Sequence, residues 1–205
     1  QALSYEKQLE YKKKKVLNNL TRIGGLENLP EFDLIGMEEP YCYRNKAQFP
    51  FGTDKNGEIV TGFYAGRTHS IISNTKCYLG VEENEQILEV ILAHLKKYNI
   101  PAYDEQTGKG LLRHVLIRKG FTTGELMVCL ILNGTQMPEV KALMNELTKI
   151  PGMTSITINV NTKQTNVIMG QEMRSVWGQD YITDYIGNVK YQISPLSFFQ
   201  VNPVQ

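Results

Sequence analysis

The spacing of apolar residues divides the chain into helical and extended segments. Apolar residues recurring every three or four positions predict helices over residues 4–21, 83–99 and 137–150. Alternating or continuous apolar runs predict strands over residues 44–51, 58–66, 111–120, 125–134, 155–161, 166–170, 175–187 and 189–194. The remaining segment, residues 25–40, is broken by Pro30, Gly36 and Pro40 and is expected to be a connector.

Capping and turn residues indicate where these elements begin and end. Ser4 is a candidate N-cap for the first helix, and the pair Gly24-Gly25 is expected to end it. Residues 54–57 read Asp-Lys-Asn-Gly, a good hairpin turn because Asn-Gly accepts positive φ. Pro138 is expected in the first turn of the third helix, and Gly187-Asn188 at the last hairpin turn.

Strand pairs that alternate with helices predict an α+β fold. We expect a mixed, largely antiparallel sheet with two helices packed on it, preceded by an N-terminal helix. This order of elements predicts a fold class but no chemistry.

Composition narrows the class of protein only slightly. Of 205 residues, 41% are hydrophobic and 21% are charged, which is ordinary for a folded domain. The sequence has neither an apolar run of about 20 residues nor the apolar core of a secretion signal, so we expect no membrane span and a cytoplasmic location. A net charge of +1 means that any polyanion binding must depend on local patches.

Common enzyme motifs are missing from the sequence. It contains no G-x-x-x-x-G-K-[ST], no H-E-x-x-H and no G-x-S-x-G. His69, His94 and His114 lack metal-ligand spacing and are expected to be structural or solvated. Three cysteines without a Cys-x-x-Cys pair argue against a disulfide framework, and Cys129 in its apolar run is expected to be buried. No complete active site is indicated.

Basic residues are more suggestive. They fall on or next to several predicted strands, where alternation could place them on one sheet face to meet RNA phosphates; they are Arg44, Lys46, Arg67, Arg113 and Arg118. From spacing alone, a solvated sheet face is the competing interpretation.

Five segments, taken in order, carry a resemblance to a known family. The stretches RIGG, YRNKAQF, KCYLG, LLRHVLIR and SPLSFFQVN resemble the RNA uridine-5-methyltransferase family, in particular the branch that acts on 23S ribosomal RNA. These enzymes use S-adenosylmethionine to methylate C5 of uridine in ribosomal or transfer RNA. SFFQVN is the most specific piece, and the likeness runs along the whole chain.

The resemblance implies a division of the chain and a role for each part. Residues 1–40 would form an N-terminal helix and connector, residues 41–190 a central RNA-recognition domain, and residues 191–205 the start of a Rossmann-like methyltransferase domain. The catalytic cysteine and glutamate of the family would lie outside this chain, which alone is expected to be inactive.

Individual residues acquire expected roles from the same resemblance. Cys77 matches the fourth cysteine of a [4Fe–4S] cluster that some branches hold; with one thiolate, the chain alone is not expected to hold it. Gln200 matches a glutamine that contacts S-adenosylmethionine. Arg44 and Lys46 match a basic motif on an RNA-facing strand, and ribosomal RNA is the expected partner ahead of transfer RNA.

Two other interpretations are compatible with the sequence. One is a stand-alone RNA-binding module without catalytic activity. The other is a scaffold protein without a nucleic-acid role, which the small net charge allows.

Overall fold

The structure, a computed structural model, describes residues 3–205 and divides the chain into two compact units. The first unit comprises residues up to Pro40 together with Val204–Gln205, and the second comprises Tyr41–Pro203.

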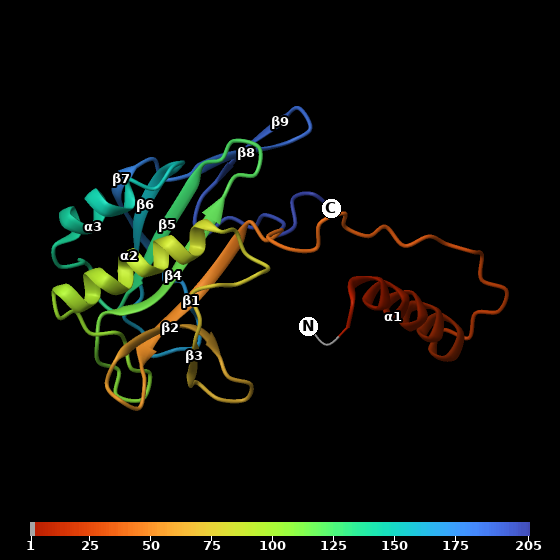
Figure 1. Ribbon diagram of the computed structural model, residues 1–205, viewed down its shortest axis with the longest axis horizontal. Helices are drawn as coiled ribbons and strands as arrows, with labels where there is room; N and C mark the ends of the chain where they lie inside the picture. Colours follow the sequence, from red (N-terminus) through yellow and green to blue (C-terminus); the bar gives the residue numbers. More distant parts are fainter. Residues whose placement is uncertain (1–2) are drawn as a thin grey trace. The chain divides into compact units, whose positions relative to one another are not determined.

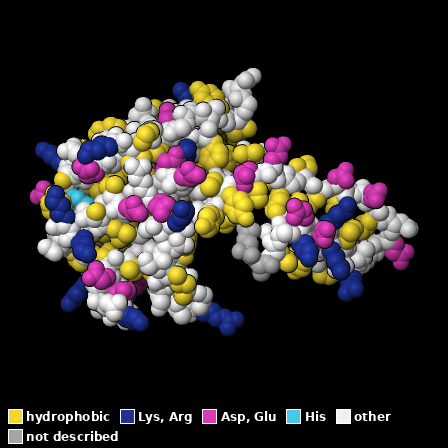
Figure 2. All heavy atoms as spheres, in the orientation of Figure 1, with side chains coloured by type: hydrophobic (Ala, Val, Ile, Leu, Met, Phe, Trp, Pro, Cys, Tyr) yellow, Lys and Arg dark blue, Asp and Glu magenta, His cyan; other side chains and the backbone are white. Residues whose placement is uncertain are grey.

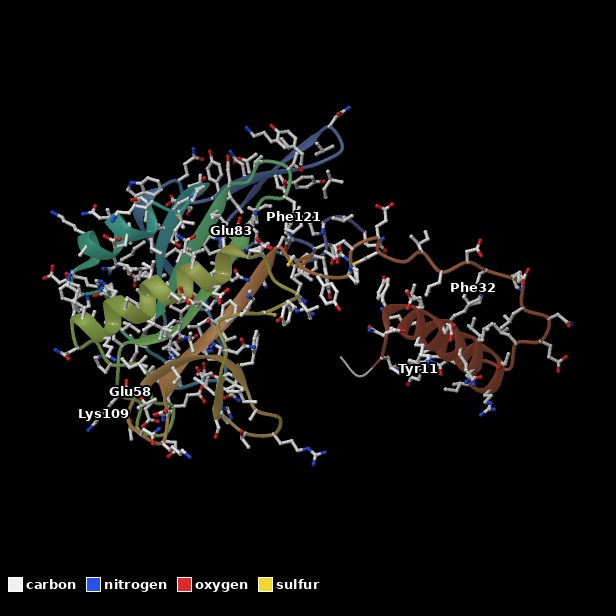
Figure 3. All side chains as sticks on the ribbon, in the orientation of Figure 1. Tyr11, Phe32, Glu58, Glu83, Lys109 and Phe121 are labelled. Atoms are coloured by element: carbon white, nitrogen blue, oxygen red, sulfur yellow. The ribbon has the colours of Figure 1, made fainter. Side chains whose placement is uncertain are left out.

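The first unit is one helix with a segment folded back along it. Helix α1 spans Tyr5–Asn18 and continues as a π-helical turn, η1, over Asn19–Ile23. Ser4 caps α1, as predicted, by accepting a hydrogen bond from the Lys7 backbone N–H at 3.4 Å. The returning connector, which carries Phe32 (Figure 3), is fixed where the Met37 N–H donates to the Tyr5 hydroxyl at 2.7 Å. None of the described α1 residues is buried, so this unit has little core of its own.

The second unit is built on a seven-stranded sheet in the order β3-β2-β1-β4-β5-β6-β7, with a separate β8-β9 hairpin. Its described elements are β1 Lys46–Thr53, β2 Ile59–Tyr64, β3 Ile71–Ser73, α2 Glu83–Lys97, β4 Leu112–Lys119, β5 Leu126–Leu132, α3 Val140–Leu147, β6 Met153–Val160, β7 Glu172–Gly178, β8 Ile182–Ile186 and β9 Val189–Ile193. Strands β5 and β6 are parallel, joined through α3, and the other neighbours are antiparallel. The α+β class and the mixed sheet are confirmed.

Helices α2 and α3 cover one face of the sheet (Figure 1). Their apolar positions pack against every second residue of the central strands, as at Phe49, Val115, Val128 and Leu130. The largest apolar cluster of the described residues therefore lies between this face and the two helices.

A smaller apolar cluster occupies the opposite face. Leu116, Met127, Cys129 and Ile131 meet Ile182 and Ile193 of the β8-β9 hairpin there, and Phe199 packs against the same cluster. Cys129 is fully buried, as expected, and burial raises the pKa of its thiol to about 12. Both faces of β4 and β5 are thus covered, which explains their continuous apolar sequence.

Three local predictions were wrong. The segment predicted as one strand over residues 175–187 is two strands, because the chain leaves the sheet after Gly178, whose φ is +73°. Residues 166–170 form no strand, because Asn159 and Asn161 donate side-chain hydrogen bonds to their carbonyls. Pro138 precedes α3, because Glu139 adopts φ +51° immediately before the helix begins.

A buried carboxylate attaches the β8-β9 hairpin to the β4-β5 turn. Asp184 is 1% exposed, and its two oxygens accept hydrogen bonds from the backbone N–H groups of Phe121 and Thr122 at 3.0 and 2.9 Å. The Thr123 hydroxyl donates to the Thr183 carbonyl at 2.7 Å beside it. These contacts position the hairpin over the second cluster.

Replacing Asp184→Ala should therefore destabilise the second unit by about 2 kcal/mol, because the N–H groups of Phe121, Thr122 and Tyr185 lose a charged acceptor. Urea unfolding followed by the fluorescence of Trp177, the single tryptophan in β7, measures this. Asp180→Ala, an exposed carboxylate in the preceding connection, is the matched control and should change stability by less than about 0.5 kcal/mol. Equal effects of the two substitutions would contradict the assignment.

Candidate nucleic-acid interface

Segments that are far apart in sequence meet at the beginning of β1. The Asn45 N–H donates to the Val201 carbonyl at 3.0 Å, and its side-chain amide donates to the Gln200 carbonyl at 2.9 Å. Asn45 is only 3% exposed, so these bonds are shielded from water. The YRNKAQF and SFFQVN stretches are thereby held against each other.

The KCYLG stretch lies on the other side of the same strand. The N–H groups of Cys42 and Arg44 donate to the carbonyls of Tyr78 and Leu79, each at 2.9 Å. Cys77 is partly buried within this turn, and its carbonyl accepts from the Gly80 N–H at 3.2 Å. Three of the stretches that carry the family resemblance therefore converge on one place, which we call the β1 entrance: residues 42–46, 77–80 and 195–201.

The β1 entrance is rich in positive charge. Arg44 is exposed and Lys46 is half-buried, while Lys46 lies directly across from Arg118 on β4. Burial, and secondarily repulsion from Arg118, lower the pKa of Lys46. None of the three forms an ion pair with the described residues, which leaves an uncompensated cluster of cations.

The cluster lies on the sheet face opposite the helices. Residues directly paired across two strands share a face, and Leu116, two positions before Arg118, belongs to the apolar cluster away from α2 and α3. The helix-bearing face of this unit shows Lys and Arg side chains intermingled with Asp and Glu (Figure 2). Lys46 and Arg118 therefore carry their charge on the sheet face away from α2 and α3.

The sequence suggested that Arg118 lies on an exposed sheet face, but the structure buries it. It is 3% exposed, and its guanidinium donates to the carbonyls of Pro195 and Ser197. Burial lowers its pKa to about 10. The expectation of an exposed Arg118 was therefore wrong. Arg118 holds residues 195–197 in place and, secondary to burial, its charge lowers the pKa of Lys46.

Arg113 also differs from the expectation of an exposed cation. It is 3% exposed, lies 4.3 Å from the Tyr103 ring centroid and donates to the carbonyls of Asn161 and Lys163, both at 2.8 Å. These carbonyls, nearly fifty residues away in the sequence, take up the guanidinium. Arg113 therefore supports the loop after β6.

The structure separates Arg67 from the β1 entrance. Arg67 is exposed at φ +64° in the loop between β2 and β3. This loop borders a hollow of about 1150 Å³ beside the opposite end of β1. We call this hollow, next to the β1-β2 hairpin, the hairpin cleft; it is lined by residues 51–55, 60, 64, 68–71, 73, 103–106, 113 and 114. Glu58 and Lys109 mark that end of the sheet, and Glu83 and Phe121 mark the other end (Figure 3). Sequence reasoning did not find this cleft.

A hydrogen-bonded group of polar side chains lines the hairpin cleft. The Tyr64 hydroxyl donates to Glu105 Oε1 at 3.1 Å, and Glu105 Oε2 pairs with His69 Nδ1 at 2.5 Å. His114 Nε2 lies 3.4 Å from the Tyr64 hydroxyl. Burial, with Glu105 nearby, raises the pKa of Tyr64, whereas burial and the charge of Arg113 lower the pKa of His114 to about 4.

A metal cluster cannot be built from the residues described. No group of three or more His, Cys, Asp or Glu side chains within residues 3–205 has the arrangement of a metal site. Cys77 alone supplies one thiolate where a [4Fe–4S] cluster needs four ligands, so these residues by themselves do not fit such a cluster. Gln200 is exposed, with its carbonyl held by Asn45 and its side chain on the surface.

Comparison with known proteins gives these features a context. No protein-family model matches the chain. The whole chain is 44% identical to an uncharacterized RNA methyltransferase of Clostridium tetani and 46% identical to one of Clostridium acetobutylicum. It spans 44% and 45% of the length of those two proteins. The chain therefore corresponds to a segment that makes up less than half the length of these RNA methyltransferases.

A solved structure shares the fold. The tRNA (uracil-54, C5)-methyltransferase of Pyrococcus abyssi, in complex with S-adenosyl-L-homocysteine, matches 98% of this chain with a TM-score of 0.79 and 25% sequence identity. The match covers 45% of that protein. In the chain described here, no helix of residues 3–205 has the length and apolarity to cross a membrane.

The lowered pKa of the buried His114 predicts a pH dependence of stability. Its folded pKa is about 4, below the ordinary histidine value, so the unfolded chain takes up the proton first as pH falls. Full stability is present above about pH 6.5 and declines toward pH 4.

From pH 7 to pH 5, His114 should cost about 2 kcal/mol of unfolding free energy. Urea titrations at both pH values measure the loss, and His114→Gln should reduce it by that amount. An unchanged difference between the two pH values in the variant would show that His114 titrates normally.

Proposed function

We propose that this chain is the substrate-recognition part of an enzyme that methylates C5 of uridine in RNA. The observation that carries the proposal is the similarity of the whole chain to a part, somewhat under half, of two RNA methyltransferases, combined with a cationic cluster without ion pairs where the resembling sequence stretches converge. S-adenosylmethionine would supply the methyl group in the whole enzyme, with the catalytic cysteine and glutamate outside this chain. The chain alone would not catalyse methyl transfer.

RNA phosphates suit the β1 entrance on electrostatic grounds. Arg44 and Lys46 carry charges that no described carboxylate neutralises, and burial already penalises the charged form of Lys46. An anion placed beside them would favour the charged form of Lys46 and offset the repulsion from Arg118. Arg67, exposed at the far end of the sheet, would contact the backbone farther along the RNA.

The entrance also adjoins the residue expected to contact the cofactor. Asn45 holds the Gln200 backbone carbonyl, and Arg44 precedes Asn45 in the chain, so the proposed phosphate contact lies next to the segment that carries Gln200. Reaching C5 of a stacked uridine requires extruding the base, which costs a few kcal/mol. Contacts to RNA remote from the reacting carbon can offset that cost.

We propose ribosomal RNA of the 23S type as the substrate class. The support for this branch is the resemblance of the YRNKAQF, KCYLG and SFFQVN stretches taken together. The neighbouring solved structure is named for a tRNA substrate, so tRNA is the comparison to be tested.

The double substitution Arg44→Ala/Lys46→Ala should weaken RNA binding roughly tenfold and reduce the slope of log K against log salt by about 1 to 2. Filter binding to a uridine-containing 23S fragment and to tRNA, at two salt concentrations, measures both quantities.

Lys96→Ala/Lys141→Ala removes the same charge from α2 and α3 and is the matched control. It should leave affinity and salt slope near the wild-type values. Similar losses in both double variants would show non-specific attraction, and unchanged binding in the first variant would exclude the β1 entrance. Tighter binding of tRNA than of the 23S fragment would overturn the substrate class.

A further inference from the structure

We propose that the hairpin cleft binds one unpaired guanine base of the RNA strand whose phosphates contact the β1 entrance. This inference rests on the proposed function, and it assigns a base-reading site to residues that the cationic cluster does not include. The residues that carry it are Phe51, Val60, Tyr64, His69, Glu105 and His114.

The cleft has room for a planar ring and a lining that suits one. Its volume of about 1150 Å³ exceeds that of one nucleoside, and Phe51, Val60 and Ile71 supply apolar surface. The rings of Tyr64 and His69 lie 5.7 Å apart, edge to face, on its wall. Tyr64 is 39% exposed, so its ring is accessible to a stacking base.

The charge inside the cleft excludes phosphate and favours hydrogen-bond donors. Three carboxylates line it, from Asp54, Asp104 and Glu105, against the cations Lys55 and Arg113. The guanidinium of Arg113 is already taken up by backbone carbonyls. A phosphate would therefore be repelled, whereas a base edge that presents N–H groups would be attracted.

Glu105 has acceptor positions left over. Asp54 and Asp104 accept bonds from their own turns, but Glu105 accepts only one bond on each oxygen, from Tyr64 and His69. A carboxylate has about four lone-pair sites, so roughly two remain for a ligand.

His114 adds a second acceptor. Because the Tyr64 hydroxyl donates to Glu105, the His114 Nε2–H is assigned as the donor to Tyr64, and this leaves Nδ1 as an acceptor. His114 is 6% exposed, and its Nδ1 has no hydrogen-bond partner among the described residues. This nitrogen is shielded from solvent, so a donor of a bound ligand reaches it only through a small shift of the ring.

Guanine matches this pattern better than the other bases. Its N1–H and N2 amino group present two adjacent donors that a single carboxylate can accept together. Adenine and cytosine offer one amino group, and uracil offers one N–H between two carbonyl acceptors that a carboxylate would repel.

The cleft and the β1 entrance can engage one strand of RNA. His114 and Arg118 lie on the same face of β4, four residues apart, which corresponds to about 13 Å. Lys55 lines the cleft and Arg67 directly precedes the lining residues Thr68 and His69, so both are near enough in the chain to contact the phosphate of the base held inside. A single-stranded segment lying along this face would therefore place its backbone at the entrance and one base in the cleft.

The test compares short oligouridine RNA that contains one central guanosine with all-uridine RNA of the same length. The 205-residue chain should bind the guanosine RNA roughly tenfold more tightly. Inosine in place of guanosine keeps N1–H but lacks the amino group, and should retain only part of that preference. Glu105→Gln should abolish the preference, because the amide presents a donor where the base needs an acceptor.

Glu58→Gln is the matched control, since Glu58 is an exposed carboxylate beside the cleft and not part of its lining. It should keep the full preference for guanosine. His69→Ala, in an exposed loop, should lower affinity for the guanosine RNA several-fold without changing thermal stability. This second variant keeps the test decisive if Glu105→Gln is poorly folded.

Failure of this inference and failure of the proposed function give different results. Equal affinity for the two RNAs, or a preference that survives both Glu105→Gln and His69→Ala, would overturn the cleft assignment alone. If Arg44→Ala/Lys46→Ala has no effect while a Glu105-dependent preference persists, the cationic entrance fails and the cleft stands. Binding of an arginine-rich peptide to the cleft, with no preference among RNAs, would assign it to a protein partner and overturn the proposal.

Discussion

The buried hydrogen bonds of Asn45 are the constraint on which the rest of this structure depends. A polar residue that is 3% exposed at the start of a strand must satisfy its backbone and side chain, and Asn45 does so with the carbonyls of Val201 and Gln200. These bonds join the first strand of the sheet to a segment 155 residues later. Arg118, through Pro195 and Ser197, attaches the same segment to β4. The exposed Gln200 and the cations Arg44 and Lys46 are consequently held at one place.

The sheet itself gives the two candidate sites a common orientation. The helices use one face for the main apolar core, so chemistry is left to the opposite face and to the ends of the strands. On that face the β8-β9 hairpin and residues 194–199 cover the middle of β4 and β5. The β1 entrance and the hairpin cleft remain accessible on either side of the covered region. One has excess positive charge and the other excess hydrogen-bond acceptors, so they suit different parts of the same nucleotide chain.

Much of the fold could be predicted from sequence, but the site could be predicted only in part. Periodicity located most of the elements, because helix and strand spacing is a local property. The burial of Arg113 and Arg118 was not predictable, since their carbonyl partners lie 48 and 79 residues away. The hairpin cleft was missed for the same reason: Tyr64, His69, Glu105 and His114 belong to separate segments. Residues 166–170 showed a strand-like pattern, which the side chains of Asn159 and Asn161 override.

Hydrogen–deuterium exchange with and without a uridine-containing 23S fragment tests most directly whether the β1 entrance binds RNA. The account predicts that RNA slows exchange in residues 42–48 and 195–203, with little change in α2 and α3. Protection that is confined to the two helices, or no protection at residues 42–48 under saturating RNA, would contradict it.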